Sequence, residues 1–480
     1  MSISNALNNA VSGLSAASRM AEVVASNTSN ALTAGYARRE ATLTSLSNGG
    51  VSVTAISRQV SDSLVKESRL ANAGAANATA IADFHTSIES LIGTDDATGS
   101  LSKTLSTFDS ALIEATASPE STTALTNAVT AAKDVASKLN DISDGIQDAR
   151  LEADSSIAAQ VEKLNSSLSQ IEDLNRAITR TIASGADANS LMDQRQTLID
   201  EISSIVPVQT LDRAGNQVAL YTANGLALLD ATAATIGFEK VGTMTADMTL
   251  ESGALSGLTV NGRAVSTLDS GALGGGSLSA AFSIRDELAP EAQANVDALA
   301  RNLIERFEGT AVDPTLSAGD PGLFTDGGSA LDTADEVGLA ERIKINAAVD
   351  PSTGGAVWRL RDGLAATAEG TVGNATLLSS LQDALSAGKV ANSGDYGSTP
   401  RSASEFAASM LSIISTANQT AQSRQTYAVA RMETASQQLL AQGVDTDQEM
   451  QTLLQVETAY SANAKVISAI DEMMQTILEL

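Results

Sequence analysis

His85 is the chain's only histidine, and an imidazole can act as a general base or bind a metal ion near neutral pH. It stands between Phe84 and Thr86 in a stretch with helical periodicity, and the chain has no cysteine. A Ser-His-Asp triad or a histidine metal site would therefore have little to work with, and thiolate chemistry and disulfides are excluded. We expect His85 to be an ordinary surface or partly packed helix residue.

Two glycine-rich stretches could belong to binding loops. The run Gly274 to Gly276 lacks both a following Lys-Ser/Thr pair and the GxGxxG spacing of phosphate loops. The run Asp326-Gly327-Gly328 does not match the ligand spacing of a calcium loop. We expect both to be turns. The sequence predicts no catalytic, cofactor-binding or metal-binding residue, and no enzyme activity.

Composition excludes further classes of protein. The chain has 480 residues, with 29 Lys+Arg against 57 Asp+Glu and a net charge of −28. Binding to nucleic acid needs a basic face, which this charge does not favour. The sequence contains no run of about 18 apolar residues, so no membrane-spanning helix is predicted. The N-terminal segment lacks the basic and apolar regions of a secretory signal peptide, so any export must use a route without one.

Glycine and proline divide the chain into three parts. Residues 1–206 hold 9 of the 35 glycines and one of the seven prolines, and residues 401–480 hold one glycine and no proline. Both residue types are unfavourable inside helices. We therefore predict a mainly α fold, with a discontinuous long-helix coiled-coil or bundle core made from both chain ends. The glycine-rich and proline-rich composition of residues 207–400 predicts an inserted, turn-rich β or α+β domain.

Apolar spacing places the elements that would build this core. Steps of three and four residues predict helices over 121–183, 191–205 and 402–441. Turn pairs between short apolar runs predict hairpins over 207–262, and strands are expected near 343–345 and 357–360.

The first helix carries a seam of apolar residues at alternating steps of four and three. Much of it is alanine, so a partner helix could approach closely. The seam residues are Ile3, Leu7, Ala10, Leu14, Ala17, Ala21 and Val24.

The last helix has the same periodicity, broken by one polar residue. Asp445 or Thr446 is expected to cap it, and Asn463 could fix register or oligomeric state. Its seam residues are Leu453, Val456, Tyr460, Asn463, Ile467, Ile470, Met474 and Ile477. Two such narrow seams at opposite chain ends would most simply pair with each other, and the pair could then pack against copies of itself.

Motifs at both ends of the chain resemble those of bacterial flagellar rod, hook and hook-associated proteins. The first is the segment from Ala25 to Arg38, and the second runs from Ala459 to Ile467. In the first motif the resemblance points to a turn after the inner helix, formed by Asn27, Asn30, Thr33, Gly35, Tyr36 and Arg38.

Interior segments are similar to the hook-associated protein 1 family, the hook–filament junction proteins. The helix motif Asp193, Gln194 and Arg195 carries this resemblance, with patches around 164–178, 276–286 and 443–445. Gln448 departs from the usual acidic residue. The chain is short for the family, which implies a reduced or missing outer subdomain.

The resemblance implies three domains. They are a terminal coiled-coil polymerisation domain (1–35 with 445–480), a long-helix bundle (36–206 with 401–444) and an inserted surface domain (207–400). Whether residues 207–400 form one domain or two stays open.

The resemblance also implies an extracellular place at the hook–filament junction. The expected partners are copies of the chain in a ring or helical layer, hook protein on one side and the next hook-associated protein on the other. A C-terminal export chaperone and the flagellar type III export apparatus are implied as well.

Three alternatives remain. A hook or distal rod protein would share the terminal motifs, although the long helices over 121–205 and the Asp193-Gln194-Arg195 segment argue against it. Flagellin is disfavoured by the Asn/Gly/Tyr turn. A secreted adhesin or surface enzyme with a coiled-coil stem is a reading from a different class.

Overall fold

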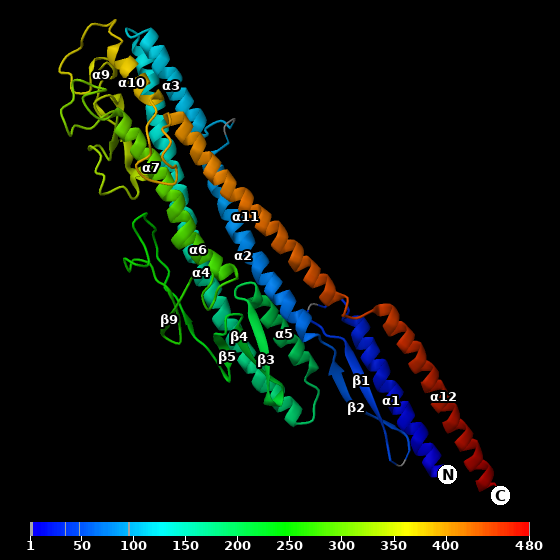
Figure 1. Ribbon diagram of the computed structural model, residues 1–480. Helices are drawn as coiled ribbons and strands as arrows, with labels where there is room; N and C mark the ends of the chain where they lie inside the picture. Colours follow the sequence, from blue (N-terminus) through cyan, green and yellow to red (C-terminus); the bar gives the residue numbers. More distant parts are fainter. Residues whose placement is uncertain (1–2, 34, 48, 95–96, 480) are drawn as a thin grey trace.

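The computed structural model describes residues 3–33, 35–47, 49–94 and 97–479. The molecule is elongated (Figure 1). Helices α1 (Ile3–Ser29) and α12 (Thr446–Leu478) lie side by side at one end, together with both chain termini. Helices α3 (Leu101–Ala117) and α10 (Thr376–Ser386) lie at the opposite end.

Long helices connect the two ends. Helix α4 (Thr122–Ala183) has 62 residues, which at 1.5 Å per residue is about 93 Å. Helix α2 (Asp62–Ile92) packs along α11 (Ala403–Leu440), and α5 (Asn189–Ser203) packs on α4. Ser121 and Ser402 cap α4 and α11 through their hydroxyl groups, as expected of serine at this position. The helices predicted over 121–183, 191–205 and 402–441 are confirmed to within about two residues.

Two apolar cores lie along α4. The first is built from α3, the first half of α4, α7 (Ala289–Phe307), α10 and the start of α11. The second joins the later half of α4 to α5, α6 (Ser277–Ser283) and the neighbouring strands. Neither core includes a residue of α1 or α12, among the residues that the structure describes. The terminal pair is therefore packed separately from the body.

The middle segment contains small antiparallel sheets and several helices. The sheets are β3 (Val208–Arg213), β4 (Gln217–Thr222), β5 (Ala227–Asp230) and β6 (Thr232–Ala233); β7 (Ile236–Gly237), β8 (Leu258–Val260) and β9 (Arg263–Val265); and β10 (Phe324–Asp326) with β11 (Ile343–Ile345). The further helices are α8 (Leu339–Arg342), α9 (Arg359–Asp362), the π-helix Ile284–Leu288 and the 3-10 turns Ala214–Asn216 and Pro351–Thr353. The predicted mainly α fold with a β-containing insert is confirmed.

Two parts of the fold differ from expectation or were not foreseen. The strand expected over 357–360 is wrong, because Gly363 at φ 119° ends the short helix α9 there and Arg361 is buried against the carbonyl of Pro119. A hairpin of β1 (Arg39–Ser45) and β2 (Val51–Arg58) follows α1 and packs against it. Its signal, alternating apolar and polar residues around Gly49-Gly50, was present in the sequence.

Candidate assembly site at the terminal helices

Helices α1 and α12 run antiparallel and meet along part of their predicted seams. On α1, Ala10, Ala17 and Val24 are buried, while Leu7 is 37% exposed. Ile3, Leu14 and Ala21 are half-buried. Gly13 lies directly against Asn463, because a Cβ atom at Gly13 would stand only 2.6 Å from Asn463 Nδ2. The small residues of α1 thus permit the close approach that the alanine-rich seam predicted.

The α12 seam is only partly covered by α1. Val456 and Ile470 are buried, whereas Tyr460 is 50% exposed. Leu453, Asn463 and Ile467 are half-buried. Near the C-terminal end, Met474 and Ile477 are exposed to 47% and 56%.

Further apolar side chains of the pair are also exposed: Val11, Met450, Leu454, Val466, Met473 and Leu478. So many large apolar side chains exposed on one helix pair indicate a site of protein association.

The hairpin covers another side of α1. Val51 N donates to Ser12 Oγ at 3.2 Å, and Ser12 Oγ itself donates to the carbonyl of Asn9 at 2.8 Å. Gly50 has φ +87°, and a side chain there would collide with Ser12. Glycine at this position therefore allows the hairpin tip to rest on the helix.

Asn27 closes the turn after α1. Its Nδ2 donates to the carbonyl of Arg39 at 2.9 Å, and its Oδ1 accepts from Arg39 N and from the Tyr36 hydroxyl at 2.9 Å each. Asn30 Nδ2 donates to the carbonyl of Ser26 at 2.9 Å, and Thr33 Oγ1 donates to Asn30 Oδ1 at 3.3 Å. Asn27 is 1% exposed, and both polar atoms of its side-chain amide have hydrogen-bond partners, as buried polar groups require.

Asp193 joins this turn to the body. Its Oδ1 accepts from Arg58 Nε at 2.7 Å and from Ala37 N at 3.4 Å, and its Oδ2 accepts from Arg39 Nη2 at 3.1 Å. Gly35, at φ +75°, packs against Thr197 one turn further along α5, leaving no room for a side chain. The predicted turn and the predicted helix motif are thus brought together, although the sequence did not connect them.

The other two residues of the helix motif lie elsewhere. Gln194 is exposed. Arg195 is buried and donates Nη1 to Asn175 Oδ1 at 2.8 Å and to the carbonyl of Asn216 at 2.7 Å, tying α5 to α4 and to the β3–β4 turn. Burial, with a smaller repulsion from Arg58, lowers the pKa of Arg195 to about 10, so it stays charged at neutral pH.

Arg38 connects the turn to the last helix. Its Nε donates to Glu449 Oε1 at 2.8 Å, and the Glu449 side chain is 2% exposed. Asp445 caps α12 by accepting from Asp447 N and Gln448 N. The chain passes between the terminal pair and the body twice, after α1 and before α12, and it bends at both crossings (Figure 1). We call residues 31–33, 35–38 and 441–445 at these crossings the elbow.

A cavity of about 390 Å³ opens at the elbow. Leu32, Val60 and Leu440 line it, and all three are exposed large apolar residues. Asp200 also lines it, and partial burial raises the pKa of its carboxyl group against the opposing effect of Arg69, whose Nε is 2.6 Å from Asp200 Oδ1. This cavity is a second candidate contact surface beside the exposed seam.

The described residues contain no group of three or more acidic, histidine or cysteine side chains placed to hold a metal ion. His85 sits edge-on to the ring of Phe84, and burial lowers the pKa of its imidazole. In the same described part of the chain, no helix is both long and apolar enough to cross a membrane. The arrangement offers packing surfaces and hydrogen-bonded joints.

Comparison with known proteins bears on these surfaces. Residues 85–318 match the sequence model of the flagellar hook-associated protein FlgK helical domain. Residues 435–480 match that of the flagellar basal body rod FlgEFG protein C-terminal region. Flagellar hook-associated protein 1 of Bacillus subtilis is 24% identical over 97% of this chain and 96% of its own length. These matches support flagellar hook-associated protein 1 as the family that the chain resembles.

Two other relatives align over less than half of this chain and of their own length. The protein of Escherichia coli is 25% identical over 48% of this chain, and the match spans 44% of that relative. The protein of Salmonella typhimurium is 26% identical over the same shares. The solved flagellar hook junction protein FlgK of Burkholderia pseudomallei has a TM-score of 0.44 and 19% identity, over 55% of this chain and 47% of its own.

Sequence reasoning missed three residues of the site. Arg39, Arg58 and Glu449 hold the elbow together, yet nothing in the local sequence distinguishes them from surface charges. Their partners lie 154, 135 and 411 positions away along the chain. Only the three-dimensional arrangement reveals them.

Proposed function

We propose that the chain is a structural adapter of the bacterial flagellum that joins the hook to the filament and performs no catalytic turnover. The observation that carries this proposal is the exposed apolar surface of the α1–α12 pair in a chain that resembles this family. Each large apolar side chain that a neighbour covers would contribute roughly 1.5–3 kcal/mol. In this proposal the pair gains stability when neighbouring chains cover these side chains.

In this proposal residues 1–35 and 445–480 form the polymerisation domain. Residues 36–206 with 401–444 form the helical body, and 207–400 form the surface domain. Copies of the chain pack in a ring or helical layer, with hook protein on one side and the next hook-associated protein on the other. Before assembly the chain is exported through the flagellar type III apparatus with the help of a C-terminal chaperone, and it functions outside the cell.

A charged residue in the α1 seam tests the proposal. Leu14→Asp places a carboxylate on the packing face without touching either core of the body. We expect the variant to be exported, to keep a folded body, and to fail to enter flagella. Asn8→Asp adds the same charge at an exposed polar residue of α1 outside the seam and the exposed apolar surface, and should be incorporated normally. Normal incorporation of the Leu14 variant would show that the seam is not the packing face.

A further inference from the structure

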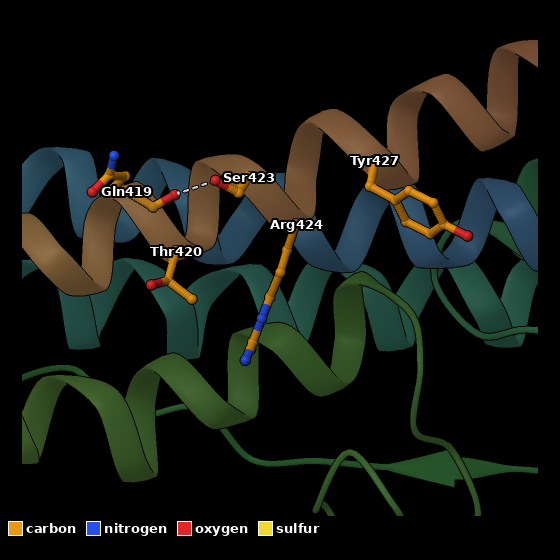
Figure 2. Close-up of a pocket in the computed structure, with 5 residues that line it drawn as sticks. All are labelled: Gln419, Thr420, Ser423, Arg424 and Tyr427. Atoms are coloured by element: carbon orange, nitrogen blue, oxygen red, sulfur yellow. Dashed lines mark hydrogen bonds between the residues drawn. The ribbon is translucent and has the colours of Figure 1, made fainter.

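The outer face of α11 carries a shallow hollow of about 470 Å³ in the helical body, away from the terminal pair. Figure 2 shows Arg424 extending from α11, with Tyr427 one turn further along. Gln419, Thr420 and Ser423 complete the lining. Tyr427 is 74% exposed, which is unusual for a large aromatic side chain on a helix whose opposite face packs along α2.

The charge of this face differs from that of the chain as a whole. No acidic residue occurs on α11 between Glu405 and Glu433, although the net charge of the chain is −28. Arg431 pairs with Glu67 at 2.7 Å. Arg424 forms no salt bridge with any side chain in the described ranges, so its guanidinium group is free to meet a partner. Tyrosine and arginine, with tryptophan, are enriched at the energetic centres of interfaces.

A complementary surface lies on α4. Asp134, Asp141, Asp144 and Asp148 follow one another at steps of seven, three and four, which places them on one face of the helix. All four are exposed, and none forms a salt bridge within the part of the chain that the structure describes. Of the neighbouring lysines, Lys133 pairs with Asp350, and Lys138 Nζ donates to the carbonyl of Leu91 at 2.7 Å. Burial lowers the pKa of Lys138, and the charge of Asp141 raises it by less. Asp134, Asp144 and Asp148 are therefore the carboxylates of the row without a paired cation in the described part of the chain.

We propose that the α11 hollow of one copy, with Arg424 and Tyr427, receives the acidic row of α4 from a second copy of the chain. This inference rests on the proposed function and adds a side-to-side contact between helical bodies to the packing of terminal helices. The two surfaces lie on different helices, α11 and α4, so each copy carries both halves of the contact. Such head-to-tail contacts close into a ring or continue as a helical layer.

The electrostatic reason for choosing a second copy is specific. Copies that each carry a charge of −28 repel one another, so assembly gains where an unpaired arginine meets unpaired carboxylates. Arginine binds a carboxylate with paired N–H donors, and the aromatic ring of Tyr427 supplies apolar contact area beside it. The contact should weaken as salt is raised, because both surfaces are exposed.

Complementary charge reversal tests the contact in a host strain that lacks its own copy of the gene. Arg424→Glu alone and Asp144→Arg with Asp148→Arg alone should each lower the share of exported chain found in flagella by about tenfold. Co-production of the two variant chains should restore it to near the wild-type share, because each hollow then faces a row of opposite charge. Lys103→Glu is the control: it changes the charge as Arg424→Glu does, but at an exposed residue outside both surfaces, and should leave incorporation unchanged.

A second measurement does not depend on charge. The chain has no cysteine, so introduced cysteines form only the intended disulfides. Tyr427→Cys and Asp144→Cys chains, produced together and oxidised in isolated flagella, should give a disulfide-linked dimer that neither variant gives alone. Thermal unfolding of the purified variants shows whether each is folded.

The outcomes separate this inference from the proposed function. Loss by each variant, restoration on co-production and a mixed disulfide dimer support the contact. Unchanged incorporation, loss without restoration, or absence of the mixed dimer overturns it, including the case in which another flagellar protein occupies the hollow. If Leu14→Asp blocks assembly while Arg424→Glu does not, only the α4–α11 contact fails. If neither variant affects assembly, the proposed function fails too.

Discussion

Arg38 and Glu449, which are 411 positions apart, form an ion pair of 2.8 Å that joins the turn after the first helix to the start of the last helix. The Glu449 carboxylate is 2% exposed, whereas Arg38 keeps a quarter of its side chain in contact with solvent. This ion pair holds the segment after α1 and the segment before α12 in a fixed position relative to each other. The direction of the terminal helices therefore depends on contacts that are made before any neighbour is present.

Removing the charge of Glu449 tests this relationship. Glu449→Gln keeps the shape of the side chain and leaves Arg38 without a charged partner, so we expect α12 to be held less firmly, by about 1–2 kcal/mol. Hydrogen exchange of the first two turns of α12 measures the change. The neighbouring exposed Gln448→Glu serves as a control, and equal protection in the wild type and the Glu449 variant would contradict the role of the pair.

Asp193 should be harder to replace than its neighbour. Asp193→Asn removes the charge that Arg39 and Arg58 share, leaving two largely buried guanidinium groups near each other. We expect a loss of roughly 2–3 kcal/mol in the free energy of unfolding, since breaking a buried pair leaves uncompensated charge. Chemical denaturation measures it. Gln194→Ala on the exposed side of α5 should change stability by less than about 0.5 kcal/mol. If Asp193→Asn costs no more than Gln194→Ala, Asp193 does not hold the turn to the body.

The contact between Gly13 and Asn463 predicts a compensating pair of substitutions. Gly13→Ala should weaken the terminal pair, because the added Cβ would stand 2.6 Å from Asn463 Nδ2. Adding Asn463→Ala removes the obstacle, and alanine is then favoured over glycine in a helix by about 1 kcal/mol. Thermal unfolding followed by helical circular dichroism should therefore rank the double variant above Gly13→Ala. If the double variant unfolds at no higher temperature than Gly13→Ala, the two helices do not approach as closely at this position as the structure indicates.

Asp297 predicts a dependence of stability on pH. It accepts from Gly338 N, Ala340 N and Gln293 Nε2, but burial outweighs these bonds and raises the pKa of its carboxyl group from 3.8 to about 6. Between these two values the folded chain holds a proton that the unfolded chain has lost. This residue therefore makes stability fall as pH rises from about 4 to 6, by roughly 2–3 kcal/mol, and makes no further change above that range.

Comparison of the wild type with Asp297→Asn isolates that effect. The variant loses acceptor capacity and should be less stable at every pH, but the difference from the wild type should be greatest near pH 4 and smaller near pH 7. Melting temperatures at closely spaced pH values give this difference. A difference that grows towards neutral pH would mean that the pKa of Asp297 is lowered in the folded chain.

Periodicity was a sound guide wherever a helix buries one continuous face. The 62-residue helix α4, its end before Gly185 and the Asp445 cap of α12 all follow from residue spacing and local capping. The seams were harder to judge, because a seam that awaits a neighbour has the same spacing as one already covered. Val456 and Ile470 are buried and Met474 and Ile477 are not, although all four belong to one pattern.

The parts that spacing could not predict depend on distant partners. The sequence marks Asp193 only as part of a family motif; its role follows from its contacts with Arg39 and Arg58, which belong to the β1–β2 hairpin. The residues 357–360 carry a short apolar run that fits a strand or a helix equally well, and the buried Arg361 decides for the helix. The composition of residues 207–400 does not predict helix α7, because the helix lies in a segment that is otherwise rich in glycine and proline.

Deletion of the gene in its own host, followed by electron microscopy of the cell surface, tests the central claim most directly. The account predicts cells with bare hooks and with filament protein lost to the medium, and restoration of filaments by the wild-type gene. Cells without hooks would move the protein to the hook or distal rod. Normal filaments on the deletion strain would contradict a role at the hook–filament junction.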